Sequence, residues 1–331
     1  MRFSNQNTGG LRRPIDQETA EVPQYVPLRR KQPQNLRIRV VTAVIFIFVM
    51  AAFLIPALWV PWIALFLFAV IAVIGGSEFS AAMRMAGFPH KPWIVSLCSL
   101  IAIILPLLKI GFGKKEYLVW STGFPGIAIV LPYLLVWLMV VLVLIIPLLK
   151  RGAEAMSGAL ISAMGILYIS YPLVSAVVIL YTLPAGWYWL LTAFAVPWIS
   201  DTTAYFVGSI VGTHKILPHI SPNKTLEGAL GGIIGPVIAM MIWLPLVLSQ
   251  QSIRIIAPKT GVLLAYAVLF GLVLGLFSQL GDLFASALKR WVGVKDFGHI
   301  LPGHGGVLDR FDSTFFTLPL TLLLGILYFG V

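Results

Sequence analysis

Nine apolar runs, separated by short polar segments, make up most of this chain. Several of them reach the roughly 20 residues that an α-helix needs to cross a bilayer. Hydrophobic residues account for 59% of the 331 residues and charged residues for only 11%, whereas a soluble domain carries about 25% charged residues. The sequence therefore predicts an all-α, polytopic integral membrane protein with about nine transmembrane helices. The predicted spans are residues 40–57, 61–81, 93–108, 123–149, 156–181, 186–208, 228–249, 262–285 and 314–330.

The segment before the first run has a different composition. Residues 1–38 are rich in Gln, Asn, Pro and Arg and show almost no apolar periodicity, which is typical of a disordered segment. No apolar core lies close to Met1, so we expect no cleavable signal peptide and a first span that remains as an anchor. We predict a disordered, basic, cytoplasmic tail over 1–38 and a transmembrane domain over 39–331, with one group of helices in 39–181 and a second in 186–331.

The distribution of basic residues predicts the orientation. With the N-terminus inside, 18 of the 23 Lys and Arg residues fall in cytoplasmic segments, as the positive-inside rule requires. The polar loops 209–227 and 286–313 then share the cytoplasmic face, and the C-terminus lies outside. The remaining five basic residues are Lys109, Lys114, Lys115, Arg254 and Lys259.

The net charge and the cysteine content exclude some classes of function. The net charge of +11 does not indicate nucleic-acid binding, because Lys and Arg accumulate beside anionic headgroups in membrane proteins. We expect no nucleic-acid partner. The single cysteine, Cys98, excludes an intramolecular disulfide and a cysteine-based metal cluster.

One polar segment, residues 286–312, is dense in charge although it lies between two apolar runs. It carries four cations, three carboxylates and two histidines, and a simple connecting loop would need none of them. The composition predicts a site for a polyanion and a metal ion; the alternative is a solvated, positive-inside loop. The charged residues are Lys289, Arg290, Lys295, Asp296, Asp309, Arg310 and Asp312.

Three carboxylates, Glu78, Asp201 and Asp282, fall within apolar runs. A charged side chain at the centre of a bilayer costs about 3 kcal/mol on insertion scales. All three lie near the predicted cytoplasmic ends of their spans, where this cost is smaller. They are candidate site residues; the alternative for each is a helix-end acid paired with a nearby cation, such as Arg84 for Glu78.

The run that contains Asp282 places several polar residues on one face. Asp282, Ser286 and either Lys289 or Arg290 recur at i, i+4 and i+7 or i+8, which is the spacing of neighbours on a helix surface. This face would point toward the cytoplasmic end of the span.

Asp309 and Asp312 lie three positions apart at the start of the last span. If this start is helical, the two carboxylates face the same way and can share a hard cation. Glycines on both sides of His304 allow the backbone to approach a phosphate closely, although they also fit a plain tight turn.

The loop before the run 228–249 reads Ser-Pro-Asn-Lys-Thr-Leu-Glu-Gly. Ser221, Lys224 and Thr225 supply a cation and two hydroxyls beside a predicted helix start, which is an arrangement that binds anions. The segment lacks the spacing of a P-loop. Helix capping by Ser221 or Thr225 fits the same residues.

A reaction between a nucleoside triphosphate and a phosphate monoester would need such a collection of groups. Unit charges about 5 Å apart at an effective dielectric constant near 20 repel by roughly 3 kcal/mol per pair. Mg²⁺ on the aspartates and a set of Lys and Arg side chains would neutralise this repulsion and align the reacting groups.

Two segments resemble the phosphatidate cytidylyltransferases, also called CDP-diacylglycerol synthases. The resemblance covers about residues 40–331 and is strongest from residue 200 onward. The first segment differs from the family pattern only at Asn223, where a lysine is common. It comprises Asp201, Ala204, Tyr205, Gly208, Gly212, Lys215 and residues 221–228. The second comprises Ser286, Leu288, Lys289, Arg290, Lys295, Asp296, Gly298, Leu301, Pro302, His304, Gly305, Gly306, Asp309, Arg310 and Asp312.

The resemblance implies a Mg²⁺-dependent reaction of CTP with phosphatidic acid at the cytoplasmic edge of a bacterial inner membrane. It further implies contact with membrane lipids, a homodimer and a second, monovalent cation such as K⁺. We expect Asp201, Asp282, Asp309 and Asp312 to bind the metal, and Lys289, Arg290, His304 and Arg310 to complete the catalytic group. His304 would either donate a proton or position the phosphates. Substrate binding would fall to Lys215, Ser221, Lys224, Thr225, Glu227, Ser286, Lys295, Gly305 and Gly306.

Two other functions stay open. The first is a cytidylyltransferase for an isoprenoid-ether phosphatidate analogue, because apolar spans do not distinguish acyl from isoprenyl chains. The second is a membrane transporter, whose polar groups should lie near the bilayer midplane with a path to both faces. The carboxylates of this chain gather at one edge, which disfavours transport.

Overall fold

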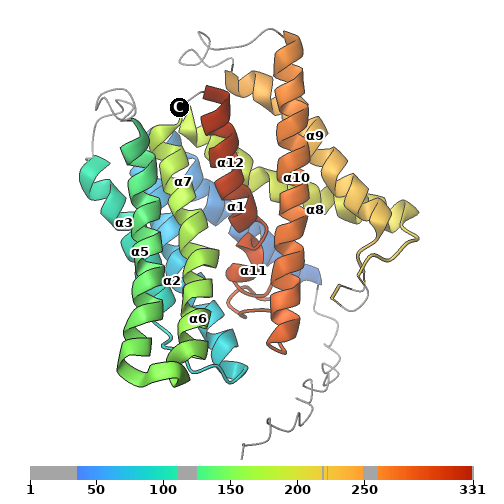
Figure 1. The fold of residues 1–331 in the computed structure, drawn as a ribbon. Helices are drawn as coiled ribbons and strands as arrows, with labels where there is room; N and C mark the ends of the chain where they lie inside the picture. The colour runs from blue at the N-terminus through green and yellow to red at the C-terminus, as the bar shows by residue number, and fades with distance from the viewer. Residues whose placement is uncertain (1–35, 111–124, 218–219, 222, 249–259, 330–331) are drawn as a thin grey trace, which may run out of the picture. The chain divides into compact units, whose positions relative to one another are not determined.

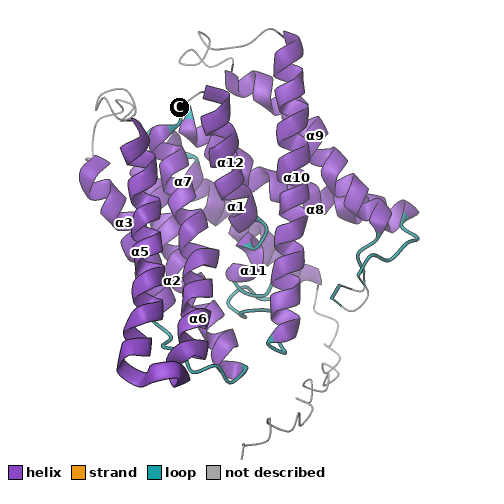
Figure 2. Ribbon diagram, viewed as in Figure 1, coloured by secondary structure: helices purple, strands orange, loops and turns teal. Residues whose placement is uncertain are grey.

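A computed structural model describes residues 36–110, 125–217, 220–221, 223–248 and 260–329. Within these ranges the secondary structure is helical and contains no β-strand (Figure 2). The longer helices are α1 (Leu36–Leu54), α2 (Trp62–Met85), α3 (Ile94–Ile110), α5 (Pro125–Arg151), α6 (Met156–Gly165), α7 (Tyr171–Thr182), α8 (Gly186–Val211), α9 (Leu226–Leu248), α10 (Thr260–Trp291) and α12 (Thr314–Phe329). Shorter elements are η1 (Pro56–Leu58), η2 (Gly152–Ala155), the π-helical η3 (Ile166–Ser170) and α11 (Leu308–Phe311).

The helices are apolar enough for a membrane protein, as predicted. Six helical segments of the described residues have the length and hydropathy needed to cross a bilayer. The longest, Ile129–Thr182, turns back at Gly152, whose φ of 68° favours glycine. As a result α5 lies beside α6 and α7 (Figure 1). The nine membrane crossings and the cytoplasmic position of the N-terminus stay predictions. The predicted disordered tail lies outside the described residues up to residue 35.

Two predicted boundaries differ from the structure. The helix α10 continues to Trp291, so Ser286, Lys289 and Arg290 belong to the helix that carries Asp282. The helix α5, predicted over 123–149, runs from Pro125 to Arg151 with Pro132 and Pro147 inside it.

The helix α9 packs between α8 and α10 (Figure 1). Two polar side chains attach its backbone to both neighbours: the Ser200 hydroxyl donates to the Gly232 carbonyl at 2.7 Å, and the Gln279 amide donates to the Ala229 carbonyl at 2.7 Å. Ser200 directly precedes Asp201, and Gln279 lies three positions before Asp282. The packing of α9 therefore fixes where both carboxylates lie.

Glycines allow this close approach. A Cβ atom on Gly271 of α10 would contact the Val237 backbone of α9 at a distance that real side chains do not adopt. Small residues at such crossings are typical of helix packing in membranes, because they let backbones approach.

We predict that Gly271→Ala destabilises the protein by about 1–3 kcal/mol, because overpacking would push α9 and α10 apart. A thermal melt of the purified protein should show an apparent melting temperature a few degrees lower. Gly261→Ala is the matched control, since a Cβ atom at Gly261 of the same helix meets no described residue within 4 Å. Equal melting temperatures for the two variants would contradict this account of the packing.

Candidate active site

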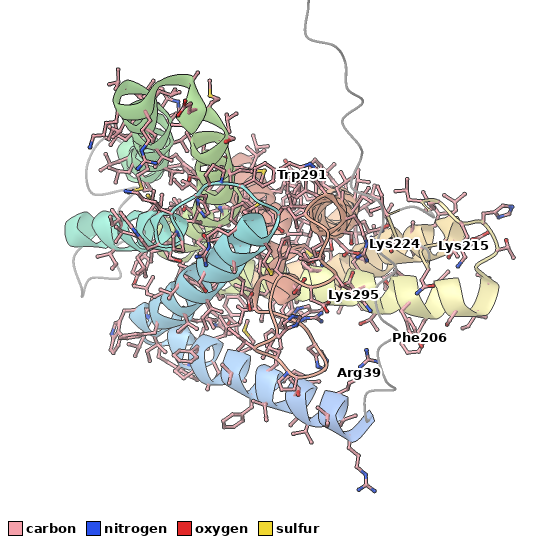
Figure 3. All side chains as sticks on the ribbon, turned by 90° about the horizontal axis from the view of Figure 1, so that it is seen from below. Arg39, Phe206, Lys215, Lys224, Trp291 and Lys295 are labelled. Carbon is pink, nitrogen blue, oxygen red and sulfur yellow. The ribbon has the colours of Figure 1, made fainter. Side chains whose placement is uncertain are left out.

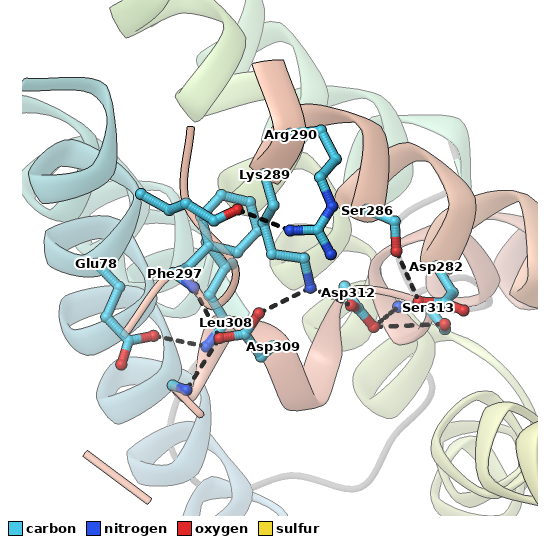
Figure 4. A network of polar contacts seen from close by, with 12 residues as sticks. Glu78, Asp282, Ser286, Lys289, Arg290, Phe297, Leu308, Asp309, Asp312 and Ser313 are labelled. Atoms are coloured by element: carbon cyan, nitrogen blue, oxygen red, sulfur yellow. Dashed lines mark hydrogen bonds and ion pairs between the residues drawn. The ribbon is translucent and has the colours of Figure 1, made fainter. Parts of the chain in front are cut away.

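The site is built around the end of α10, α11 and the loop between them (Figure 4). The Lys289 ammonium lies 2.9 Å from Asp309 Oδ1 and 3.8 Å from Asp312 Oδ2. It also lies over the Phe297 ring, 5.5 Å from the ring centroid. All three charged side chains are buried. Asp309 and Asp312 face the same ammonium group in the structure, whereas the shared hard metal cation stays a prediction.

Asp309 also organises the loop that precedes it. Its Oδ2 accepts hydrogen bonds from the backbone amides of Phe297 at 2.8 Å and Gly306 at 2.9 Å. Together with Lys289, these donors engage both carboxylate oxygens. The assignment of Asp309 as a metal ligand stays a prediction, and in the structure its carboxylate contacts Lys289 and two loop amides.

Asp282 and Asp201 extend the cluster to α10 and α8. Asp282 Oδ2 pairs with Lys224 Nζ at 2.5 Å, and the Ser286 hydroxyl lies 3.5 Å from Asp282 Oδ1. Asp201 lies close enough to Asp282 for their charges to repel, and Lys224 and Arg310 attract it. Asp312 is repelled by Asp282 and Asp201 in the same way. The structure thus brings three carboxylates from distant parts of the chain together.

The oxygen atoms of these carboxylates are suitable ligands for a hard divalent cation. Mg²⁺ prefers oxygen ligands and is often held by one or two carboxylates, with substrate phosphates and water completing its coordination. Within the described ranges no group of three His, Cys, Asp or Glu side chains is placed so that it could hold a metal ion.

Glu78 is the residue whose role the sequence did not reveal. It lies in α2, and its carboxylate accepts hydrogen bonds from the amides of Val307 at 3.1 Å and Leu308 at 2.8 Å, at the start of α11. Its partner is this backbone, and among the described residues it makes no ion pair with Arg84, so the alternative of a helix-end acid paired with Arg84 is not supported. A Cβ atom on Gly298 or Gly306 would collide with the Glu78 carboxylate. Its only signal in the sequence is a carboxylate inside an apolar run.

The loop over residues 297–307 turns through Gly303 and Gly305, whose φ angles are 80° and 84°. Within the described residues, His304 Nδ1 of this loop and Arg310 Nε of α11 are buried without a hydrogen-bond partner. Burial, and then the positive charge of Arg310, lowers the pKa of His304. A neutral imidazole near pH 7 favours positioning over proton donation.

The loop before α9 combines binding groups with structural ones. The Thr225 hydroxyl accepts the Gly228 amide at 3.2 Å, which is the capping contact that the sequence left open. The Glu227 carboxylate accepts the Thr213 hydroxyl at 2.8 Å and contacts His214 Nδ1 at 2.6 Å. Glu227 therefore holds the loop, whereas Lys224 faces the site through Asp282.

Further cations lie around this end of the molecule. Figure 3 labels Arg39, Lys215, Lys224 and Lys295 as seen from below. Arg39, at the start of α1, lies close enough for its positive charge to act on His304. The Arg290 guanidinium donates to the Val294 carbonyl at 3.2 Å. Cations gathered in this way can attract a polyanion.

Apolar helices that end in a cluster of aspartates, lysines and arginines define the class of this protein, an integral membrane protein with a charged site. Comparison with known proteins narrows this class. Residues 37–328 match the sequence profile described as "Cytidylyltransferase family". The chain belongs to this family and is an enzyme of the nucleotidyltransferase class.

Similar curated proteins carry one name. The phosphatidate cytidylyltransferase of Staphylococcus aureus (strain COL) is 33% identical over 289 residues, which cover 87% of this chain and 98% of the relative. That of Staphylococcus epidermidis (strain ATCC 12228) is 32% identical over 290 residues, with the same coverage of 87% and 98%. That of Staphylococcus saprophyticus is 32% identical over 289 residues. The resemblance noted in the sequence is confirmed at the level of the family.

We predict that Glu78→Gln loosens the loop without unfolding the protein. Hydrogen bonds to a charged group contribute about 1.5–3 kcal/mol, and the amide would keep only part of this. Hydrogen exchange measured by mass spectrometry should accelerate in peptides that cover residues 297–308. Glu154→Gln, at an exposed carboxylate, is the control and should leave the exchange unchanged. Unaltered exchange in Glu78→Gln would show that the loop does not depend on this carboxylate.

Proposed function

We propose that this protein transfers CMP from CTP to phosphatidic acid, yielding CDP-diacylglycerol and pyrophosphate. The observation that carries the proposal is the charged cluster at the end of apolar helices, in a chain similar to phosphatidate cytidylyltransferases. At such a position a lipid phosphate can arrive from the bilayer and a nucleotide from water. Membership of an enzyme family leaves the transporter alternative without support.

The reaction is an in-line displacement at phosphorus. An ionised oxygen of the lipid phosphate attacks the α-phosphorus of CTP and forms a new P–O bond. The bond from the α-phosphorus to the oxygen that bridges to the β-phosphate breaks, and pyrophosphate leaves with that oxygen and its electron pair. Because the attacking oxygen is already ionised, no protein nucleophile is needed.

The cations of the site would counter the repulsion between the substrates, which is about 3 kcal/mol per pair of charges 5 Å apart at an effective dielectric constant near 20. Lys224 and Arg310 already lie beside the carboxylates and would bind the phosphates. We assign Lys289 and Asp309 to positioning, because they engage each other and the loop. His304 would orient a phosphate with its neutral ring.

Asp282 and Asp312 would hold Mg²⁺, with Asp201 as a third candidate. When bound, the ion would neutralise developing charge on the phosphates and help to align them. A monovalent cation and a homodimer stay predictions that rest on the family resemblance.

The function is tested with the purified protein in detergent, phosphatidic acid, Mg²⁺ and each labelled nucleoside triphosphate in turn. We expect CDP-diacylglycerol and pyrophosphate in equal amounts, from CTP in strong preference to ATP, GTP and UTP. An isoprenoid-ether phosphatidate analogue is assayed in parallel, and comparing the product formed from the two lipids shows which of them is the substrate. Absence of a liponucleotide product with every lipid would refute the proposal.

The metal assignment gives a second prediction. Asp282→Asn should raise the Mg²⁺ concentration for half-maximal activity by tenfold or more, because it removes a charged ligand. Asp309→Asn should lower the melting temperature, since it leaves Lys289 buried and poorly paired, while the Mg²⁺ requirement of the remaining activity stays near wild type. A Mg²⁺ titration at saturating CTP and phosphatidic acid measures both. If the Mg²⁺ concentration for half-maximal activity rose only in Asp309→Asn, Asp309 would be a metal ligand and the assignment made here would be wrong.

A further inference from the structure

A cavity of about 640 Å³ lies among α5, α6, η3, α7, α10 and α12. Its lining is almost wholly apolar and includes Leu160, Leu167, Phe284 and Phe315. Leu160 and Leu167 are 53% and 50% exposed, so the mouth of the cavity opens on the outer surface of these helices. In a membrane protein this surface faces hydrocarbon. The volume lies within the range of about 300–1,000 Å³ that is usual for ligand pockets.

The helix α12 connects this cavity to the charged cluster. The lining residues Phe315, Phe316, Pro319 and Leu320 follow Asp312 by three, four, seven and eight positions. This is the spacing of one helix face, so the face that begins at the carboxylate continues as a wall of the cavity. A ligand with a charged head at Asp312 would find apolar surface directly beyond it.

Tyr168 lies where the cavity meets the cluster. It lines the cavity, and its ring packs against Phe284 at 5.4 Å and Phe315 at 5.5 Å between centroids. Its hydroxyl is buried and has no hydrogen-bond partner in the part of the chain that the structure describes, and the charges of Asp312, Asp309 and Asp282 act on it. Buried hydroxyls are normally paired, so an orphan one calls for an explanation. Tyr168 also belongs to η3, and π-helical turns occur frequently at functional sites.

We propose that the cavity receives an acyl chain of the lipid substrate and that the Tyr168 hydroxyl donates a hydrogen bond to an ester oxygen near the lipid phosphate. This inference rests on the proposed function. A diacyl lipid phosphate combines the three features that the place requires. It has an anionic head for the metal and cations, polar ester groups for a single buried donor, and a hydrocarbon chain for an apolar cavity open to the bilayer.

Direct binding is tested first, because it does not depend on turnover. Wild-type protein is irradiated with phosphatidic acid that carries a diazirine in one acyl chain, and the labelled peptides are identified. We expect label in the segments 156–172 and 315–320, and unlabelled phosphatidic acid should compete with it. Label spread over the outer helix surfaces without competition would refute a specific acyl site.

Substitution at the mouth then tests chain selectivity. Leu160→Trp should raise the KM for dioleoyl phosphatidic acid at least fivefold more than the KM for dihexanoyl phosphatidic acid, with the KM for CTP unchanged. Ile238→Trp is the matched control, since Ile238 is 55% exposed on α9 and does not line the cavity; both its KM values should match wild type. Equal effects on both chain lengths would overturn the proposal. The proposal would also be overturned if the ratio of the two lipid KM values stayed unchanged while native mass spectrometry showed that Leu160→Trp abolishes a dimer. That result would indicate that the cavity binds a second copy of the chain.

Tyr168→Phe tests the hydrogen bond. It should raise the KM for both lipids about threefold to tenfold and leave the KM for CTP and the melting temperature near wild type. A lowered melting temperature with unchanged KM values would show a purely structural tyrosine. If wild-type protein made no liponucleotide from either lipid, the proposed function itself would fail, whereas a negative result in the variants alone rejects only the acyl site.

Discussion

The buried pair of Lys289 and Asp309 holds the site together. Moving two charges out of water costs several kcal/mol per ion, and their attraction offsets this cost only when further hydrogen bonds satisfy both groups. Here the amides of Phe297 and Gly306 donate hydrogen bonds to the Asp309 carboxylate. Asp312 is a second negative neighbour of the Lys289 ammonium. Since these partners come from α10, the loop and the region after α11, forming the pair fixes all three parts. Glu78 secures the same loop from α2, through the amides of Val307 and Leu308.

In the structure the carboxylates of the site interact with cations of the chain. Asp282 pairs with Lys224, and Asp309 and Asp312 with Lys289, which is the more deeply buried of the two lysines. The difference in burial separates two roles. Lys224 is about one-third exposed and can move from Asp282 to a phosphate, which would free an oxygen for a metal ion. Lys289 cannot make this exchange without opening the loop.

The sequence predicted the helices and the gathering of acids well, because both follow from local patterns. Long apolar runs determine the helices, and the spacing of Asp282, Ser286 and Lys289 determines a helix face. The partners of individual carboxylate oxygens were beyond such reasoning. Glu78 and Leu308 are 230 positions apart, so no local pattern connects them. Asp309 and Asp312 look alike in sequence, yet tertiary contacts engage both oxygens of Asp309. The contacts of Glu227 with Thr213 and His214 were likewise not visible in the sequence.

The cavity beside Tyr168 would explain why the proposed reaction needs a membrane-embedded scaffold. An enzyme that joins a water-soluble nucleotide to a lipid must bring a polar reaction centre close to hydrocarbon without exposing either to the wrong solvent. Asp312 lies two positions before the start of α12, and Phe315, Phe316, Pro319 and Leu320 of that helix line the apolar cavity. The aromatic rings of Tyr168, Phe284 and Phe315 lie between the two environments. Aromatic side chains suit this position, since they combine a large apolar surface with, for tyrosine, a single polar group.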